Sequence, residues 1–338
     1  MSKGRGPSMI KRVFLSEFFI LYVSIIYFFV LIPFEPRLGS PRNLQNIFSN
    51  MLPLLMVAVG QTYVLITAGI DLSVMSTIAF CSVIGASIMT LDHGFLAGSP
   101  MAVPLAILAM LAIGCFIGFL NGAAIAFLQM PPFIVTLTSM IFFEGLAIWY
   151  SNWFTGSRNI LSNNISHFPP LFEEIDWGSF YGIPYPLFIA LFVVILAMAI
   201  LRRTVMGRWI HALGHNPNTA RISGVPLKKT VLFTYMFCGF CAALASVIYT
   251  SRLGASNTDT GDKLLNVIGA VVIGGTSLFG GKGKIPWTIY GVLFITLIEN
   301  TLNMYNLSFY VIIVVKGGII LAAAFLDAVR NRLATESS

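Results

Sequence analysis

Four ionisable side chains lie inside long apolar runs of this 338-residue chain, where a charge is costly to bury. They are Asp71, Glu144, Glu299 and Lys316. Intramembrane carboxylates are typical of proton or sodium pathways, so an ion-coupled carrier that works without an ATPase is one interpretation. Asp71 can instead cap the helix that follows it, and Glu299 can pair with Lys316 between the last two apolar runs. We expect these structural roles and retain the ion-coupled carrier as an alternative.

A second set of polar side chains in the apolar runs carries amide or hydroxyl groups and no charge. A path for a neutral, polar solute needs such hydrogen-bonding groups, and an unpaired amide is costly to bury. Many membrane threonines bond only to their own helix, so the amides are the stronger candidates. The residues that could line a path, named here the path residues, are Gln61, Asn121, Thr136, Thr138, Asn266, Asn300 and Asn303.

The sequence lacks the motifs of a nucleotide-hydrolysing enzyme. The glycine-rich stretch 274–284 does not have the G-x-x-x-x-G-K-[ST] spacing of a phosphate-binding loop, so we expect no catalysis and no cofactor in this chain. Its glycines favour close packing or a helix break at membrane depth. Cys238 and Cys241 share a helix face but have no His or carboxylate neighbour, which predicts no metal site.

Composition assigns the chain to the integral membrane proteins. Hydrophobic residues make up 57% of the sequence and charged residues 10%, against roughly 25% charged in soluble domains. The mean hydropathy is +0.86. We expect an all-α protein in the lipid bilayer, with residues 1–338 forming one polytopic domain. The net charge of +7 would indicate nucleic acid in a soluble chain, but here we attribute it to membrane topology and expect no nucleic-acid partner.

Apolar runs bounded by Pro, Gly or charged clusters predict about ten transmembrane helices. Their ranges are 13–34, 50–68, 73–91, 101–128, 132–151, 187–201, 230–251, 264–278, 285–303 and 308–327. Broken or re-entrant helices are expected near 69–73, which is too short to leave the membrane far, and near 274–284. This arrangement places fourteen Lys and Arg residues on one side and five on the other, so we expect both termini in the cytoplasm.

The two longest polar segments, 202–229 and 151–186, are predicted to lie on opposite sides of the membrane. Segment 202–229 has six basic and no acidic residues, which assigns it to the cytoplasm. Within it, Asn216 suits a helix cap, Pro217 the first helical position and Gly224 the end, which predicts one short helix. Segment 151–186 is rich in aromatic residues and fits an external loop, either as a membrane-interface anchor or as a docking surface for a partner.

Five short motifs, in this order, resemble a known family. They are Gly69-Ile70-Asp71-Leu72-Ser73, Asn121-Gly122, Pro131-Pro132-Phe133-Ile134-Val135-Thr136-Leu137, Gly214-His215-Asn216-Pro217 with Ala220-Arg221-Ile222-Ser223-Gly224, and Val271-Val272-Ile273-Gly274-Gly275-Thr276-Ser277-Leu278. Together, over about residues 50–327, they resemble the permease subunit of bacterial ABC importers for ribose and related sugars. The resemblance implies a multi-pass protein of the bacterial inner membrane that imports a sugar or a sugar-like polyol.

The resemblance also implies partners. Such permeases work in pairs, with a cytoplasmic ABC ATPase that binds ATP and Mg²⁺ and with a periplasmic solute-binding protein. The second permease would be another copy of this chain or a paralogous permease. By the same resemblance, segment 207–224 fits a groove of the ATPase and couples its motion to the pore. The residues implied in this coupling are Gly207, Arg208, Gly214, Asn216, Pro217, Ala220, Arg221, Ser223 and Gly224.

Two departures from the family pattern bear on substrate and assembly. The chain reads Gly261-Asp262-Lys263-Leu264-Leu265-Asn266 where the family usually has Gly-Tyr-Glu-Leu-Asp, and Met75 stands where a glycine is usual. Loss of an acidic pair near the outer mouth points away from ribose itself and suggests pairing with a different permease subunit. A permease for branched-chain amino acids or another small solute is a further alternative, which the Asn-Pro, Ala-Arg and Ser-Gly pattern disfavours.

Overall fold

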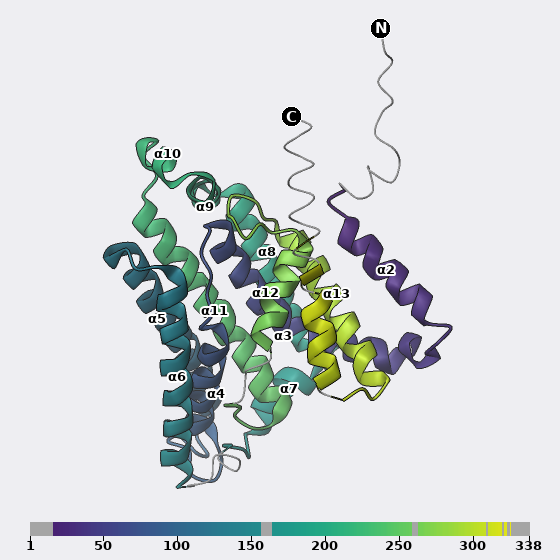
Figure 1. The fold of residues 1–338 in the computed structure, drawn as a ribbon. Helices are drawn as coiled ribbons and strands as arrows, with labels where there is room; N and C mark the ends of the chain where they lie inside the picture. Colours follow the sequence, from purple (N-terminus) through teal and green to yellow (C-terminus); the bar gives the residue numbers. More distant parts are fainter. Residues whose placement is uncertain are drawn as a thin grey trace.

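The computed structural model describes residues 16–156, 164–258, 263–308 and 310–319, together with residues 321, 322 and 325. Within these residues the chain forms a bundle of apolar helices (Figure 1). Each of the ten predicted apolar ranges overlaps one helix. These helices are α2 (Phe19–Leu31), α3 (Pro41–Ile66), α4 (Val74–Met89), α5 (Ala102–Leu128), α6 (Pro132–Thr155), α8 (Tyr185–Arg203), α11 (Leu227–Leu253), α12 (Lys263–Gly274), α13 (Ile285–Met304) and a last helix over Tyr310–Ile319.

Length divides these helices into two groups. Among the described residues, six helices are long and apolar enough to cross a membrane, namely α3, α5, α6, α8, α11 and α13. The others are shorter: α12 has 12 residues, which corresponds to roughly 18 Å against a hydrocarbon core of about 30 Å. A helical, multi-pass membrane protein is confirmed, whereas ten full crossings remain a prediction. The two termini lie outside the described residues, so their cytoplasmic location stays a prediction.

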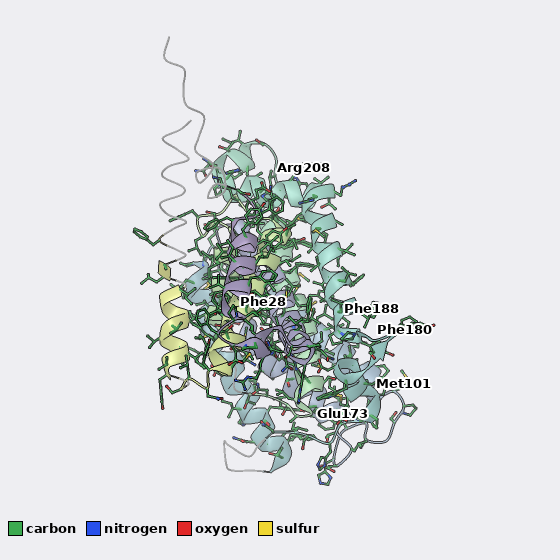
Figure 2. All side chains as sticks on the ribbon, turned by 90° about the vertical axis from the view of Figure 1, so that its right-hand side faces the viewer. Phe28, Met101, Glu173, Phe180, Phe188 and Arg208 are labelled. Atoms are coloured by element: carbon green, nitrogen blue, oxygen red, sulfur yellow. The ribbon has the colours of Figure 1, made fainter. Side chains whose placement is uncertain are left out.

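The polar segments contain more secondary structure than the sequence predicted. Segment 202–229 holds two helices, α9 (Val205–His215) and α10 (Pro217–Ile222), where one was expected. Segment 151–186, predicted to be external, contains helix α7 (Pro170–Trp177) and an antiparallel hairpin of β1 (Ser179–Phe180) and β2 (Ile183–Pro184), a small exception to the all-α prediction. Figures 1 and 2 show α9 and Arg208 at one end of the bundle, and α7 and Glu173 toward the other.

Helix α3 lies at the centre of the bundle and begins earlier than predicted. A short 3-10 helix, η1 (Pro36–Gly39), precedes it. Ser40 caps α3, because its Oγ accepts a hydrogen bond from Asn43 N (3.3 Å), and Pro41 takes the first position. The predicted start at residue 50 was wrong because the first turns are polar. All residues from 51 to 66 are buried, and α11 packs along both α3 and α5.

Two breaks interrupt the helices where the sequence predicted them. Residues 67–73 are not helical between α3 and α4, and residues 275–284 are not helical between α12 and α13. The second break begins earlier than expected, because α12 ends at Gly274 and not at residue 278. Non-helical backbone inside a membrane protein must find other hydrogen-bond partners. Here Gly281 N donates to Ile66 O (2.8 Å), so the second break bonds to the end of α3, where the first break starts.

Candidate functional site

Helices α9 and α10 form a helical corner at one end of the bundle, named here the α9–α10 corner (Figure 1). Thr204 Oγ1 accepts from Gly207 N (3.3 Å) and caps α9. Asn216 Oδ1 accepts from Thr219 N (3.0 Å) and caps α10, and Pro217 takes the first helical position. Gly224 follows with a φ of +79°, a conformation that favours glycine. The predicted short helix is therefore confirmed, with its cap, start and end at the expected residues.

The residues implied in coupling divide into an exposed and a buried group. The exposed group comprises Arg208, Asn216, Pro217, Arg221, Ser223 and Gly224. Gly207, Gly214 and Ala220 are buried. Ile222, which the sequence analysis did not single out, is 87% exposed at the end of α10. Because α10 presents this apolar side chain beside basic and amide groups, its surface suits contact with another protein.

Further basic residues extend the positive surface at this end. Lys282 and Lys284 lie in the break 275–284, which contacts α9. Lys284 Nζ donates a hydrogen bond to the Glu17 carboxylate, and this bond lowers the pKa of Glu17. The Lys284 ammonium also lies 4.8 Å from the centre of the Trp287 ring. The distribution agrees with the positive-inside rule for a cytoplasmic surface.

Gly214 connects the α9–α10 corner to both breaks. A Cβ at this position would lie 1.8 Å from Ile66 O and 2.5 Å from Gly281 N, so only glycine permits so close an approach. His211 Nδ1 lies 3.2 Å from Gly281 O and adds a polar contact. The contact of Gly214 with Ile66 and Gly281 is named here the glycine junction. Through it, α9 rests directly on the end of α3 and on the break 275–284.

Three of the path residues surround the first break, residues 67–73. Thr136 Oγ1 lies 2.9 Å from Pro132 O of its own helix and 3.3 Å from Ile70 O of the break. Gln61 pairs with the backbone of Asp71 when its amide is oriented so that Nε2 donates to the carbonyl O and Oε1 accepts from the backbone N, both at 3.2 Å. The Gln61 side chain therefore satisfies both backbone groups of a residue in the break.

The third of these residues, Asn121, binds the side chains of the same break. Its Nδ2 donates to Ser73 Oγ (2.8 Å), and Asp71 Oδ1 accepts from Ser73 N (2.9 Å) and Ser73 Oγ (2.6 Å). Asp71 is only 2% exposed. The expectation that Asp71 caps α4 was wrong. Its carboxylate bonds to Ser73 and stabilises the turn of the break itself, and no side chain forms a capping hydrogen bond at the start of α4. The cluster stabilises this non-helical segment inside the bundle.

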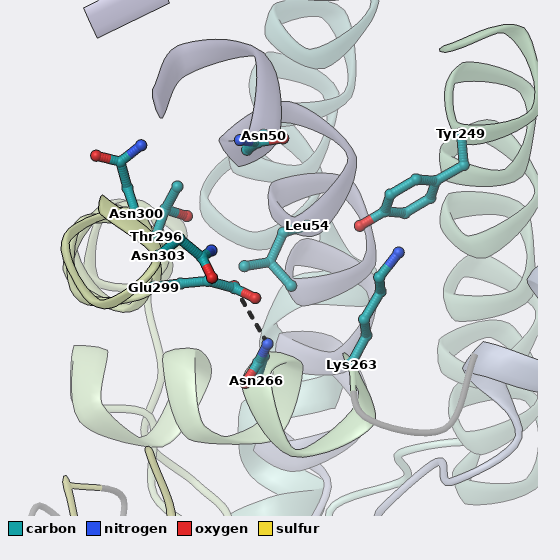
Figure 3. Close-up of a pocket in the computed structure, with 9 residues that line it drawn as sticks. All are labelled: Asn50, Leu54, Tyr249, Lys263, Asn266, Thr296, Glu299, Asn300 and Asn303. Atoms are coloured by element: carbon teal, nitrogen blue, oxygen red, sulfur yellow. Dashed lines mark hydrogen bonds between the residues drawn. The ribbon is translucent and has the colours of Figure 1, made fainter. Parts of the chain in front are cut away.

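A polar pocket of about 200 Å³ lies between α3, α11, α12 and α13 (Figure 3). Asn266 Nδ2 donates to Glu299 Oε2 (3.4 Å), and Lys263 Nζ lies 4.4 Å from the centre of the Tyr249 ring. The lining residues are Asn50, Leu54, Tyr249, Lys263, Asn266, Thr296, Glu299, Asn300 and Asn303. The three path residues of α12 and α13 thus meet in one cavity, near the ends of α11 and α13 that lie away from the α9–α10 corner.

Two groups at this pocket are tied to other parts of the protein. Lys316 Nζ donates to Glu299 Oε1 (2.7 Å), which confirms the predicted pair between α13 and the last helix. Asn300 forms a reciprocal amide pair with Asn43 of α3, at 3.0 and 2.9 Å. Thr138 lies elsewhere: its Oγ1 donates to carbonyls of its own helix, and it lines a depression between α5 and α6. For Thr138, as for the other path residues, a place on a solute path stays a prediction.

The fold and these sites define a class, namely a multi-pass helical membrane protein with a helical corner at its basic end and a polar pocket inside the bundle. Residues 43–324 match the family described as branched-chain amino acid transport system / permease component. The chain belongs to this family of transport permeases and is a multi-pass protein of the inner membrane.

Curated relatives extend over nearly the whole chain. The ribose import permease protein RbsC of Haemophilus influenzae is 36% identical over 87% of this chain and 87% of its own length. RbsC of Escherichia coli K12 is 34% identical, over 94% and 96%. The D-allose transport system permease protein AlsC of Escherichia coli K12 is 33% identical, over 92% and 90%. No solved structure is significantly similar to the chain. The resemblance to permeases of sugar importers is confirmed.

Proposed function

We propose that this chain is the translocation subunit of an ATP-driven ABC importer for a sugar or a sugar-like polyol. The observation that carries the proposal is the near full-length similarity to permeases named for ribose and D-allose. The chain transports and does not hydrolyse ATP; ATP and Mg²⁺ belong to a partner ATPase. Residues 1–338 act as one permease domain.

The α9–α10 corner is the proposed contact with the ATPase. Its capped helix α10 carries the exposed Ile222 next to the exposed Arg221, and Arg208 is exposed on α9, so the corner offers a surface that a groove in a partner can enclose. Because the glycine junction joins α9 to the end of α3 and to the break 275–284, a displacement of α10 reaches backbone inside the membrane. ATP-driven closure of the partner would thereby switch the pore between inward-open and outward-open states.

This function fixes a topology. The corner and both termini lie in the cytoplasm, the chain crosses the membrane about ten times, and the opposite end faces the periplasm. There α7 and the hairpin expose Trp177, Phe180 and Tyr181, the last by 92%, and such aromatic surface suits a periplasmic solute-binding protein. The working unit contains a second permease, either another copy of this chain or a paralogue.

The alternatives have less support. An ion-coupled carrier needs carboxylates free to exchange ions, but Glu299 is paired with Lys316 and Asp71 is bonded to Ser73. A permease for branched-chain amino acids is named in the family description, whereas the similar proteins compared above are named for sugars. Uptake that survives loss of the ATPase but collapses with the membrane potential would favour the carrier.

A pull-down tests the proposal. The tagged chain is purified from detergent-solubilised membranes, as wild type and with residues 216–224 replaced by a Gly/Ser segment of equal length. We expect an ATPase to co-purify with the wild type and not with the replaced segment, at equal membrane levels of both. If the ATPase bound equally to both proteins, its contact would lie outside residues 216–224. If no ATPase bound to either protein, the proposal of an ABC importer would be contradicted.

A further inference from the structure

We propose that the polar pocket is a solute-binding site within the permease and that it recognises a neutral polyol through hydrogen bonds. The inference rests on the proposed function, because it concerns the substrate of the same transport path. Particular residues of α12 and α13 would contact the solute (Figure 3).

The buried hydroxyl of Thr296 is the strongest sign of a ligand. Thr296 lines the pocket and is 4% exposed, and its Oγ1 has no hydrogen-bond partner among the described residues. A threonine inside a helix commonly donates to the carbonyl one turn earlier, as Thr301 of the same helix does to Leu297 O (2.8 Å). A buried hydroxyl without a partner is unfavourable. A solute hydroxyl in the pocket would supply the missing bond.

The rest of the wall suits hydroxyl groups better than a charged solute. Asn266 and Asn303 carry amides, and each amide offers both donors and an acceptor, as a sugar hydroxyl does. Leu54 adds an apolar surface against which C–H groups can pack. The two charged groups of the wall already have partners within the protein: the Glu299 carboxylate is bonded to Lys316 and to Asn266, and the Lys263 ammonium lies over the Tyr249 ring. An amino acid, with a full ammonium and a full carboxylate, is matched less well.

The size and position of the polar pocket agree with a site where a solute binds transiently during transport. A cavity of about 200 Å³ has room for one monosaccharide. Tyr249 and Asn303 place it near the ends of α11 and α13, on the side of the bundle away from the α9–α10 corner. In the proposed topology a solute released at the periplasmic end therefore meets this pocket before it reaches the two breaks.

Two threonines of α13 provide a matched test. Thr296→Val removes the unpartnered hydroxyl in the pocket, whereas Thr301→Val removes a hydroxyl that is bonded to its own helix and lies outside the pocket. Uptake of radiolabelled D-ribose and D-allose is measured in cells that express the complete importer, and thermal unfolding is measured on the purified complex. We expect Thr296→Val to lower the uptake rate about three- to tenfold, as loss of one hydrogen bond predicts, without lowering the melting temperature.

The control should show the opposite pattern, with Thr301→Val lowering the melting temperature and leaving uptake unchanged. Asn266→Leu, a second pocket variant of similar size, should reduce uptake at least as much as Thr296→Val. Normal sugar uptake by both pocket variants would overturn the pocket assignment and leave the proposed function intact. A loss of uptake in Thr296→Val that tracks an equal loss of stability would also overturn it. Import of leucine and of neither sugar by the wild type would refute the proposed function and the polyol site together.

Discussion

Replacement of Gly214 by alanine should force α9 away from the two breaks. The new Cβ would lie 1.8 Å from Ile66 O, and ordinary van der Waals contact begins near 3.4 Å, so the backbones must separate by about 1.6 Å. Overpacking of this kind costs about 1–3 kcal/mol. Weakening of the hydrogen bond from Gly281 N to Ile66 O adds about 1 kcal/mol, which the higher helix propensity of alanine offsets by about the same amount. We expect a net loss of about 2 kcal/mol.

Gly145 of α6 supplies the matched control. It is also a helical glycine, but a Cβ there would meet nothing within 4 Å. Gly145→Ala should therefore leave stability unchanged or raise it by up to about 1 kcal/mol.

Thermal unfolding of the purified chain in detergent measures both variants, and uptake together with ATP hydrolysis measures coupling. For Gly214→Ala we expect a melting temperature lower by roughly 4 °C or more and a reduced amount of solute imported per ATP hydrolysed. A Gly214→Ala protein that melts and transports like Gly145→Ala would refute the close contact of α9 with the breaks.

Further substitutions test the remaining sites. Ala220→Glu places a charge at a position that is 3% exposed; it should displace α10 and abolish uptake at an unchanged membrane level, as uptake assays and immunoblots would show. Asn121→Leu removes the bond to Ser73 Oγ; it should lower unfolding stability by about 1 kcal/mol and reduce transport, while the ATPase still co-purifies. Lys316→Met removes the cation from the partly exposed Glu299 carboxylate and should cost about 1–3 kcal/mol in thermal melts. Addition of Glu299→Gln should recover most of that loss, and the absence of recovery would contradict the pairing.

The sequence predicted those helices whose signals are local. Apolar runs marked all ten helical ranges, and Asn216, Pro217 and Gly224 marked α10 because cap, first position and end are read within a few residues. α9 was missed because its apolar positions, among them Ile210 and Leu213, alternate with basic and polar residues in a segment that was interpreted as a loop. Thr204, which caps it, was the available signal.

The candidate sites required tertiary contacts that spacing does not contain. Each path residue could be named from its type, but only packing divides them into Gln61, Asn121 and Thr136 around the first break and the asparagines of α12 and α13 around the pocket. The pair of Glu299 and Lys316 was predictable because it joins consecutive helices. The glycine junction was not predictable, because it joins three segments that are distant in sequence. The contacts use backbone atoms, which every residue has, so residue type gives no signal for them.

The short helix α12 touches both functional regions at once. Its first turns carry Lys263 and Asn266 into the polar pocket, and its last residue, Gly274, leads into the break whose Gly281 meets Gly214. If the proposed ATPase contact at α10 changes the affinity of the pocket for solute through this connection, a bound solute changes the affinity of α10 for the ATPase by the same factor, because coupling between two binding equilibria is reciprocal. In the proposed importer, a solute in the pocket should therefore change how tightly the ATPase binds α10, so that the empty and the loaded permease differ at the α9–α10 corner.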